Sequence, residues 1–425
     1  MLSTTLDNQT IQARRFGEGV AKWCLFCFSA FAVVNYTCNL SYWRFLGPIW
    51  DKLVLAVMAY IALVRYIQGY RPERFAWSKY GGWYVLYCVA LMLAGDHNPV
   101  LVFDGFMMDV EFILFGMLMP YIVDRDDLPK ILYCAVCTSI LLGMHGVFQY
   151  IMKVPVPATW LDVGESVRTR VYSLMQSPAE LGANMELALP VLIALTFVDR
   201  HRVRKWLYLA GSVCCLATLV FTFDRGSWLG LGCAVLITSI VYERRILPIL
   251  IVLAAVLFLV PPIHHRVMDL FNEVYIVKSA QGGRIMLWQQ AFDVMAKAPF
   301  FGAGLGRYGG AIATSHTFSL YSDNYYAKIL GESGLVGLTL FAAMQVAILR
   351  DVARVLRKAA GRTRLLALAG LTGVIAILVH SFVENLFEYS YTANLYFLMV
   401  GLILLWGRTL EEDAAVRRGT SSWSS

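Results

Sequence analysis

The sequence contains few charged residues and no stretch of low complexity. Asp, Glu, Lys and Arg together make up 15% of the 425 residues, whereas hydrophobic residues make up 58%. A soluble chain usually has about a quarter charged residues. This shortage of charge excludes an intrinsically disordered chain and argues against a soluble enzyme of several domains. We therefore expect a polytopic membrane protein with roughly ten to thirteen spans.

The nine cysteines lack the partners that metal or redox chemistry needs. Cys24/Cys27 and Cys134/Cys137 are C-x-x-C pairs, but each lies in an apolar run with no His or further Cys nearby. Such thiols usually behave as small buried hydrophobic groups. No cluster has the spacing of metal ligands either. We expect no metal and no cofactor. A nucleic-acid partner is not expected, because basic residues in a membrane protein first mark its cytoplasmic side.

Twelve apolar segments are long enough, or nearly long enough, to cross a membrane. We expect an all-α fold in which they are transmembrane helices and 1–425 is a single integral membrane domain. A long loop, 264–324, separates the ninth and tenth segments. Its apolar residues between Met286 and Met295 recur at helical spacing, which predicts one or two amphipathic helices. The twelve segments are roughly 20–38, 50–68, 81–95, 106–124, 130–151, 180–199, 205–223, 227–242, 246–263, 325–349, 365–384 and 391–407.

Basic residues are distributed unequally between the two sets of loops. The loops and tails on the side of the N-terminus carry 24 Lys and Arg, against six in the short loops on the other side. Cytoplasmic loops carry this excess in membrane proteins. Both termini are therefore expected in the cytoplasm. The 264–324 loop is expected on the outer side, and its length exempts it from the charge rule.

Four arginines lie on the side that the charge bias disfavours. Arg168 and Arg170 precede the sixth span, Arg225 lies in the short turn F-D-R-G-S-W, and Arg284 lies in G-G-R-I-M-L-W of the long loop. A guanidinium group stays charged and binds phosphate oxygens in a bidentate manner. Several of them converging on one outer cavity would suit a diphosphate group. Contact with lipid phosphates at the membrane surface is the alternative.

Polar residues also precede the tenth span, in the stretch S-D-N-Y-Y over 322–326. Asp323 and Asn324 would lie at the outer mouth of that helix, where either could cap its N-terminus. A carboxylate beside an arginine-lined cavity could also act as a general base. His316, seven residues earlier, is a second candidate base, unless it is an ordinary surface histidine.

Ionisable residues inside or at the edge of spans are expensive and are therefore functional candidates. Lys328 and Glu332 are four residues apart on one predicted helix and could simply neutralise each other. At least one of Asp109 and Glu111 is expected near the headgroups or paired with a cation. The full set is Asp109, Glu111, Glu186, Asp224, Arg225, Lys328, Glu332 and Glu384.

The stretch from Gly304 to Gly309 fits the pattern G-x-G-x-x-G of nucleotide-binding loops. No strand precedes it and no βαβ unit surrounds it, so the pattern lacks its structural context. We predict that these glycines form a sharp turn after Pro299 instead.

Four stretches, in this order, resemble the shared core of the O-antigen ligases and the O-antigen or exopolysaccharide polymerases. These are integral membrane glycosyltransferases whose donors are glycans linked to a polyprenyl diphosphate. The resemblance is strong over about 165–340. The stretches are R-V-Y-S-L-M-Q-S-P-A-E-L-G from Arg170, F-D-R-G-S-W-L from Phe223, G-R-I-M-L-W to P-F-F-G-A-G-L-G within 283–306, and D-N-Y-Y-A-K-I-L-G-E-S-G-L-V-G from Asp323.

The resemblance implies metal-independent, inverting transfer at the periplasmic face of a bacterial inner membrane. The donor would be a polyprenyl-diphosphate-linked glycan, and the acceptor another glycan or lipid A–core, with membrane lipid around the protein. Arg225 and Arg284 stand where the family binds the donor diphosphate. Arg170 and Arg168 are expected to assist them.

The resemblance also implies a role for the D-N pair. Asp323 stands where the ligases have the histidine that is taken as the base, and His316 might substitute for it. Asn324 and Tyr325 are expected to contact the substrate. A D-N pair is more typical of the polymerases, so ligase and polymerase both stay open. Outside the family, the alternative is a non-enzymatic transporter or lipid flippase, which would more often place its ionisable residues at the membrane midplane.

Overall fold

The computed structural model describes residues 14–40, 42, 44–94, 98–155, 169–259, 264, 268 and 283–421. Every regular element within these residues is a helix, which confirms the all-α prediction. Short 3₁₀ turns are η1 (Arg125–Asp127), η3 (Arg244–Ile246) and η5 (Leu386–Glu388). The α-helices are α2 (Glu18–Ser29), α3 (Phe31–Cys38), α4 (Trp50–Ile67), α5 (Ser78–Ala94), α6 (Pro99–Ile122), α7 (Leu128–Ile151), α8 (Pro178–Val198), α9 (Arg202–Phe221), α10 (Arg225–Tyr242), α11 (Leu247–Phe258), α14 (Arg284–Lys297), α15 (Ala311–Ser315), α16 (Tyr325–Lys358), α17 (Gly361–His380) and α18 (Ser390–Ser421).

Each of the twelve predicted spans falls on a helix or, for 20–38, on the pair α2 and α3. Seven of the described helices are long and apolar enough to cross a membrane, or eight if α2 and α3, bent by 89°, form one span. Helix α5 has only 17 residues and α11 only 12 in helical conformation. The count of twelve spans therefore stays a prediction.

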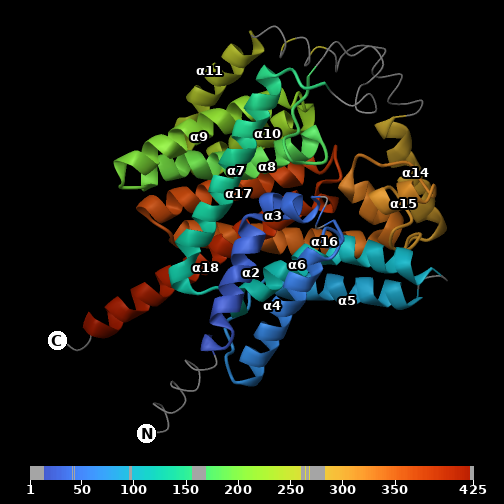
Figure 1. Ribbon diagram of the computed structural model, residues 1–425, viewed down its shortest axis with the longest axis horizontal. Coiled ribbons are helices and arrows are strands. Elements are labelled where there is room, and N and C mark those ends of the chain that lie inside the picture. Colours follow the sequence, from blue (N-terminus) through green and yellow to red (C-terminus); the bar gives the residue numbers. More distant parts are fainter. Residues whose placement is uncertain are drawn as a thin grey trace.

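The helices pack into one bundle in which α17 lies between α8 and α10 (Figure 1). Helix α16 packs against α5 and α14, and α18 packs against α6 and α8. The two chain ends leave the bundle on one side, whereas α14 and α15 lie at the opposite side (Figure 1). Helix α14 lies within 264–324, as predicted. It is buried on one face, through Leu287 and Ala291.

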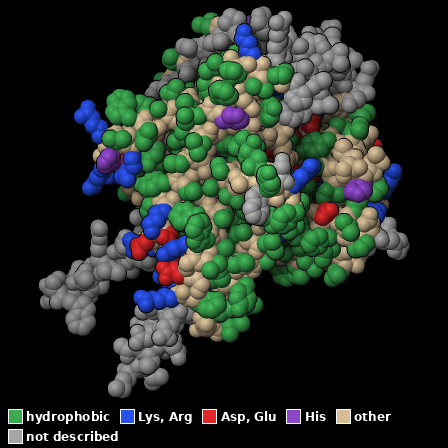
Figure 2. Space-filling view, viewed as in Figure 1, with side chains coloured by type: hydrophobic (Ala, Val, Ile, Leu, Met, Phe, Trp, Pro, Cys, Tyr) green, Lys and Arg blue, Asp and Glu red, His purple; other side chains and the backbone are tan. Residues whose placement is uncertain are grey.

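The outer surface of the bundle is largely apolar. Figure 2 shows hydrophobic side chains over much of the visible face. On α9, for example, Trp206, Leu207 and Val213 are each more than half exposed. Monomeric soluble proteins rarely expose contiguous apolar surface of this extent. Together with the apolar helices, this surface indicates a multi-pass membrane protein.

A buried lysine joins three parts of the bundle. Lys328 of α16 forms ion pairs with Glu332, at 2.9 Å, with Glu388 of η5, at 3.5 Å, and with Asp109 of α6. All four side chains are 3% exposed or less. The predicted pairing of Lys328 with Glu332 is confirmed, and Asp109 is paired with a cation as expected. Glu111 of α6 has Lys52 as its partner, at 3.5 Å.

We expect Lys328→Met to lower the melting temperature by several degrees, because it leaves three buried carboxylates without their cation. Lys52→Met is the matched control. The Lys52 side chain is 36% exposed, so its loss should have a smaller effect. The measurement is thermal unfolding of the purified protein in detergent. Equal melting temperatures for wild type and Lys328→Met would contradict a central role for this cluster.

The loop after Pro299 packs backbone to backbone on a break in α16. Gly334 interrupts the helix with φ of 64°, and Leu335 N donates to the Pro299 carbonyl at 2.9 Å. A Cβ atom on Gly334 would lie 2.5 Å from the carbonyl carbon of Phe300, so only glycine fits. Positive φ at Gly304 and at its neighbouring glycines confirms the predicted sharp turn.

Candidate active site

The stretch before α8 lies along the end of α9. The Arg170 Nε donates a hydrogen bond to the Thr222 carbonyl at 3.1 Å, and Val171 N donates to the Phe221 carbonyl at 3.1 Å. These bonds hold the half-buried Arg170 beside the turn that carries Arg225. Arg168 lies outside the described residues.

The F-D-R-G turn starts α10. The Asp224 carboxylate caps this helix, since its Oδ2 accepts a hydrogen bond from Ser227 N at 2.8 Å. Arg225 is the first helical residue and is half-buried. The cap therefore determines where the Arg225 side chain leaves the backbone.

A buried histidine connects this turn to the bundle. Nε2 of His380, the last residue of α17, lies 3.2 Å from Asp224 Oδ2, and its Nδ1 lies 3.2 Å from Glu186 Oε2 of α8. Gly226 lets the ring approach, because a Cβ atom there would lie 2.6 Å from Nε2. Burial opposes the charge of Asp224, but the positive charge and hydrogen bond of His380 outweigh it and hold the pKa of Asp224 well below its usual range.

The second predicted arginine pairs with the predicted base. Arg284 Nε, at the start of α14, lies 3.2 Å from Asp323 Oδ2, and both side chains are 36% exposed. A substrate can therefore reach this pair. Asn324 caps α16, because its side chain accepts hydrogen bonds from Tyr326 N and Ala327 N. The capping alternative for the D-N pair is thus confirmed for Asn324, and Asp323 is directed toward Arg284.

The segment after α17 holds the D-N stretch in place. Tyr325 N donates to the Ser381 carbonyl at 3.0 Å, and Asn324 N donates to Asn385 Oδ1 at 3.1 Å. The Asn385 amide also donates to the Gly309 carbonyl at 2.7 Å. Asn385 thus forms hydrogen bonds with both the glycine turn and the N-terminal end of α16.

The charges of both ion pairs act on Glu384. It follows α17 and is half-buried, and removal from water, followed by the negative charge of Asp323, raises its pKa to about 7. Arg284 opposes that shift, and the charges of Asp224 and His380 also act on Glu384. The Arg284–Asp323 pair and the Asp224–His380 pair are therefore close enough to share one electrostatic field.

Left-handed backbone recurs at the same stretches. Five described residues other than glycine have positive φ, and three of them, Ser173, Phe223 and Asp323, belong to the stretches that resemble the family. Such conformations are uncommon for these residues and concentrate at functional sites. This observation supports a functional role for all three turns.

Residues 210–342 match the model of a family described as O-antigen ligase. This match supports the resemblance of the chain to the O-antigen ligase and polymerase superfamily. The matched residues run from the middle of α9 to the middle of α16, so they include Arg225, Arg284 and Asp323. No curated protein matches the chain. The matched family implies glycosyl transfer of the ligase or polymerase type in general, with glycan donor and acceptor substrates.

Two predicted site residues, His316 and Tyr325, have partners other than the Arg284–Asp323 pair. The exposed His316 stacks on Phe318, and its Nδ1 lies 3.1 Å from the Ile312 carbonyl of its own turn. Tyr325 is buried, and its hydroxyl lies 3.4 Å from Asp109 Oδ1. Their predicted roles stay predictions, and the burial of Tyr325 favours support of the site over direct contact with substrate.

Sequence reasoning missed His380 and Asn385. Both follow the last stretch that resembles the family and lie outside the residues that the family model matches. Glu186 and Glu384 carried a signal, since ionisable groups in spans are expensive. Their partners are distant in the sequence, however, so no pattern could pair them.

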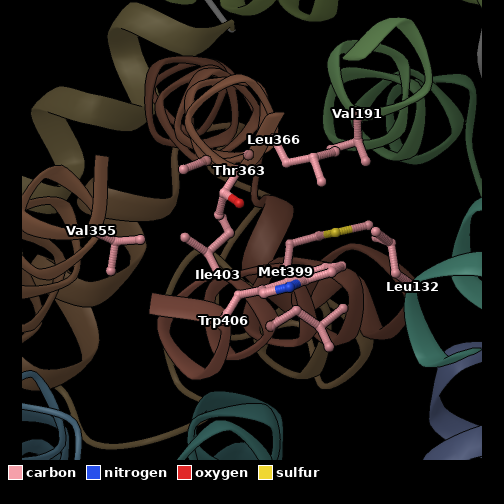
Figure 3. A pocket seen from close by; sticks show the side chains of 11 residues that line it. Leu132, Val191, Val355, Thr363, Leu366, Met399, Ile403 and Trp406 are labelled. Carbon is pink, nitrogen blue, oxygen red and sulfur yellow. The ribbon is translucent and has the colours of Figure 1, made fainter. Parts of the chain in front are cut away.

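Neither of two other kinds of site within the described residues, a metal cluster and the apolar cavity of Figure 3, suits this chemistry. No group of three or more His, Cys, Asp or Glu in the described part of the chain is arranged to hold a metal ion. The cavity of Figure 3 lies among α7, α8, α16, α17 and α18 and is lined by side chains such as Met399 and Trp406. None of its lining residues is ionisable, so it does not suit a diphosphate group.

Proposed function

We propose that this protein transfers a glycan from a polyprenyl diphosphate to an acceptor sugar hydroxyl at the periplasmic face of the inner membrane. The contact between Arg284 and Asp323 is the observation that carries the proposal. It places a permanent cation beside a carboxylate at a solvent-accessible position. A diphosphate leaving group needs the first, and an attacking hydroxyl needs the second.

In the proposed reaction, the acceptor oxygen attacks the anomeric carbon with inversion. The new glycosidic bond forms as the bond between that carbon and the diphosphate breaks. The electron pair and negative charge leave with the lipid diphosphate, and Asp323 takes the hydroxyl proton. Arg284 and Arg225, aided by Arg170 and Arg168, stabilise the departing charge without a metal ion.

The arginines would supply much of the catalytic effect. A charge-assisted hydrogen bond contributes about 1.5–3 kcal/mol. Two such bonds used mainly in the transition state would contribute roughly 3–6 kcal/mol, or about 10²–10⁴ in rate. Glu384 is influenced by Arg284 and by Asp224, the residue before Arg225, which supports the idea that Arg225 and Arg284 act on one substrate.

The acceptor distinguishes ligase from polymerase. A ligase would use lipid A–core, whereas a polymerase would extend another glycan. Asp323, in place of the ligase histidine, favours the polymerase type. Asn324 and Asn385 would hold the mouth of α16 rigid in either case.

An assay with purified protein in liposomes tests the function. We expect a labelled polyprenyl-diphosphate glycan to be cleaved only when an acceptor is present, also in EDTA, with one glycosidic bond formed per diphosphate released. Lipid A–core and a second glycan are offered separately as acceptors. Movement of intact donor across the membrane, without cleavage, would favour a transporter and overturn the proposal.

The proposed topology gives a further test. Reporter fusions after Arg204 and Arg362 should report the cytoplasm, because these loops belong to the basic set. A fusion after Thr317, which follows α15, should report the periplasm. A cytoplasmic signal after Thr317 would place Arg284 in the wrong compartment for a periplasmic donor.

A further inference from the structure

A polar cavity lies at the end of the bundle away from α14 and α15. It has a volume of about 380 Å³ and opens between the N-terminal segment, the junction of α6 and α7, and α18. This volume is within the range of small-ligand sites. Helix α6 begins beside the glycine turn, since Gly105 contacts Leu305 and Gly306, and it ends at this cavity. Gly105 and Pro120 are 15 residues apart on this helix, so about 22 Å of helix separates the glycine turn from the cavity.

Three arginines from separate parts of the chain line the cavity. Arg14 belongs to the N-terminal segment, Arg125 to η1 and Arg408 to α18. Arg14 Nε lies 2.6 Å from Asp124 Oδ1, and the Arg408 guanidinium lies 4.6 Å above the Phe75 ring. These contacts orient the side chains. Figure 2 shows basic and acidic side chains gathered at this end of the molecule, between the two chain ends.

A fourth arginine, Arg65, is buried and does not line the cavity itself. Arg65 is 1% exposed and donates to the Phe16 carbonyl at 3.0 Å and the Tyr121 carbonyl at 2.8 Å. Within the described residues, its buried Nη2 makes no hydrogen bond. Its charge interacts with that of Arg14, and Asp124 opposes both, so Arg65 adds to a positive charge that the carboxylates only partly offset.

The floor of the cavity is apolar. Pro120, Val123, Leu128 and Leu405 are buried there, where α6 ends, α7 begins and the apolar part of α18 ends. The rim carries the three arginines and one carboxylate, Glu73. An apolar floor under a mainly basic rim matches a group that has both a phosphate and a hydrocarbon part. Basic pockets between membrane helices bind anionic headgroups in this way.

We propose that this cavity binds the phosphate of an anionic membrane lipid, in the leaflet on the side of the chain termini. Arg125 and Arg408 hold the phosphate oxygens, and the apolar floor contacts the glycerol and the start of an acyl chain. In the proposed topology, this is the cytoplasmic leaflet. The site is separate from glycan transfer and does not depend on it.

Native mass spectrometry of the full-length protein in detergent tests this proposal with short-chain phosphatidylglycerol as the probe. We expect saturable binding to wild type and at least a tenfold weaker apparent affinity in Arg125→Gln/Arg408→Gln. Arg245→Gln is the matched control. Arg245 has a 95% exposed side chain in η3 and does not line the cavity, so binding should not change. Arg125→Gln alone serves if the double variant unfolds at a lower temperature.

Two further probes separate the possible sources of the phosphate. Phosphatidylcholine should bind at least tenfold more weakly than phosphatidylglycerol, and inorganic phosphate should compete only at far higher concentration. Equal binding of the two lipids would mean that the cavity does not select an anionic headgroup, because phosphatidylcholine also carries a phosphate but has no net charge. Competition by inorganic phosphate at the lipid's own concentration would identify a soluble phosphate as the ligand. Either result, or unchanged binding in Arg125→Gln, would overturn the proposal.

Discussion

Replacement of Arg284 by alanine is expected to reduce glycan transfer by roughly 10- to 150-fold, and replacement of Arg225 by a similar factor. Each change removes one charge-assisted contact with the departing diphosphate. The double variant should lose about 10²–10⁴ in rate. Lysine at either position should restore only part of the activity, because it keeps the charge but not the bidentate geometry. The measurement is cleavage of the labelled donor by purified protein.

Arg307→Ala is the matched control for the clamp. Arg307 lies in the same loop region, but its guanidinium is 5.6 Å from the Phe318 ring. We expect this variant to keep near wild-type activity. Full activity in Arg284→Ala, at an unchanged melting temperature, would show that its assignment is wrong.

Asp323→Asn is expected to lower transfer by about 10²–10⁴, the usual contribution of a general base. The amide keeps the shape of the side chain but cannot take a proton. The helix cap is unaffected, because Asn324 provides it. Asp323→His restores the residue typical of the ligases and should retain measurable activity. His316→Ala should have little effect, since His316 is exposed and engaged with its own turn.

Glu384 gives the same step a pH dependence. Burial and the nearby Asp323 raise the pKa of Glu384 to about 7, so the group is neutral below that pH and charged above it. A charged Glu384 competes for Arg284 and leaves Asp323 a stronger base. We therefore expect the rate to rise as pH increases through about 7. In Glu384→Gln this inflection should disappear.

The combined results assign the base. Loss in Asp323→Asn with activity kept in His316→Ala supports Asp323. The reverse pattern transfers the role to His316. If Glu384→Gln alone abolishes transfer while Asp323→Asn does not, Glu384 is the proton acceptor. Matched protein levels and melting temperatures are the control for all variants.

Local chemistry in the sequence predicted much of the site. Apolar runs of about 20 residues can only be buried or placed in lipid, so the helices follow from composition. An outward arginine opposes the charge bias, which made Arg225 and Arg284 stand out without any structure. The spacing of Lys328 and Glu332 predicted their contact, because helical residues four apart share one face.

Contacts between residues distant in the sequence could not be predicted from it. His380 contacts Glu186, 194 positions away in the chain, and also Asp224. Asn385 joins Asn324 to Gly309. No periodicity or motif encodes such pairs, since they depend on how α8, α10 and α17 pack. Glu384 likewise became significant only through the two ion pairs around it. The sequence by itself determined the helices, the resemblance to the family and the candidate reactive groups, because these depend on local composition and short patterns. Tertiary structure alone decided which charges from distant parts of the chain meet, because electrostatic interactions depend on distance in space.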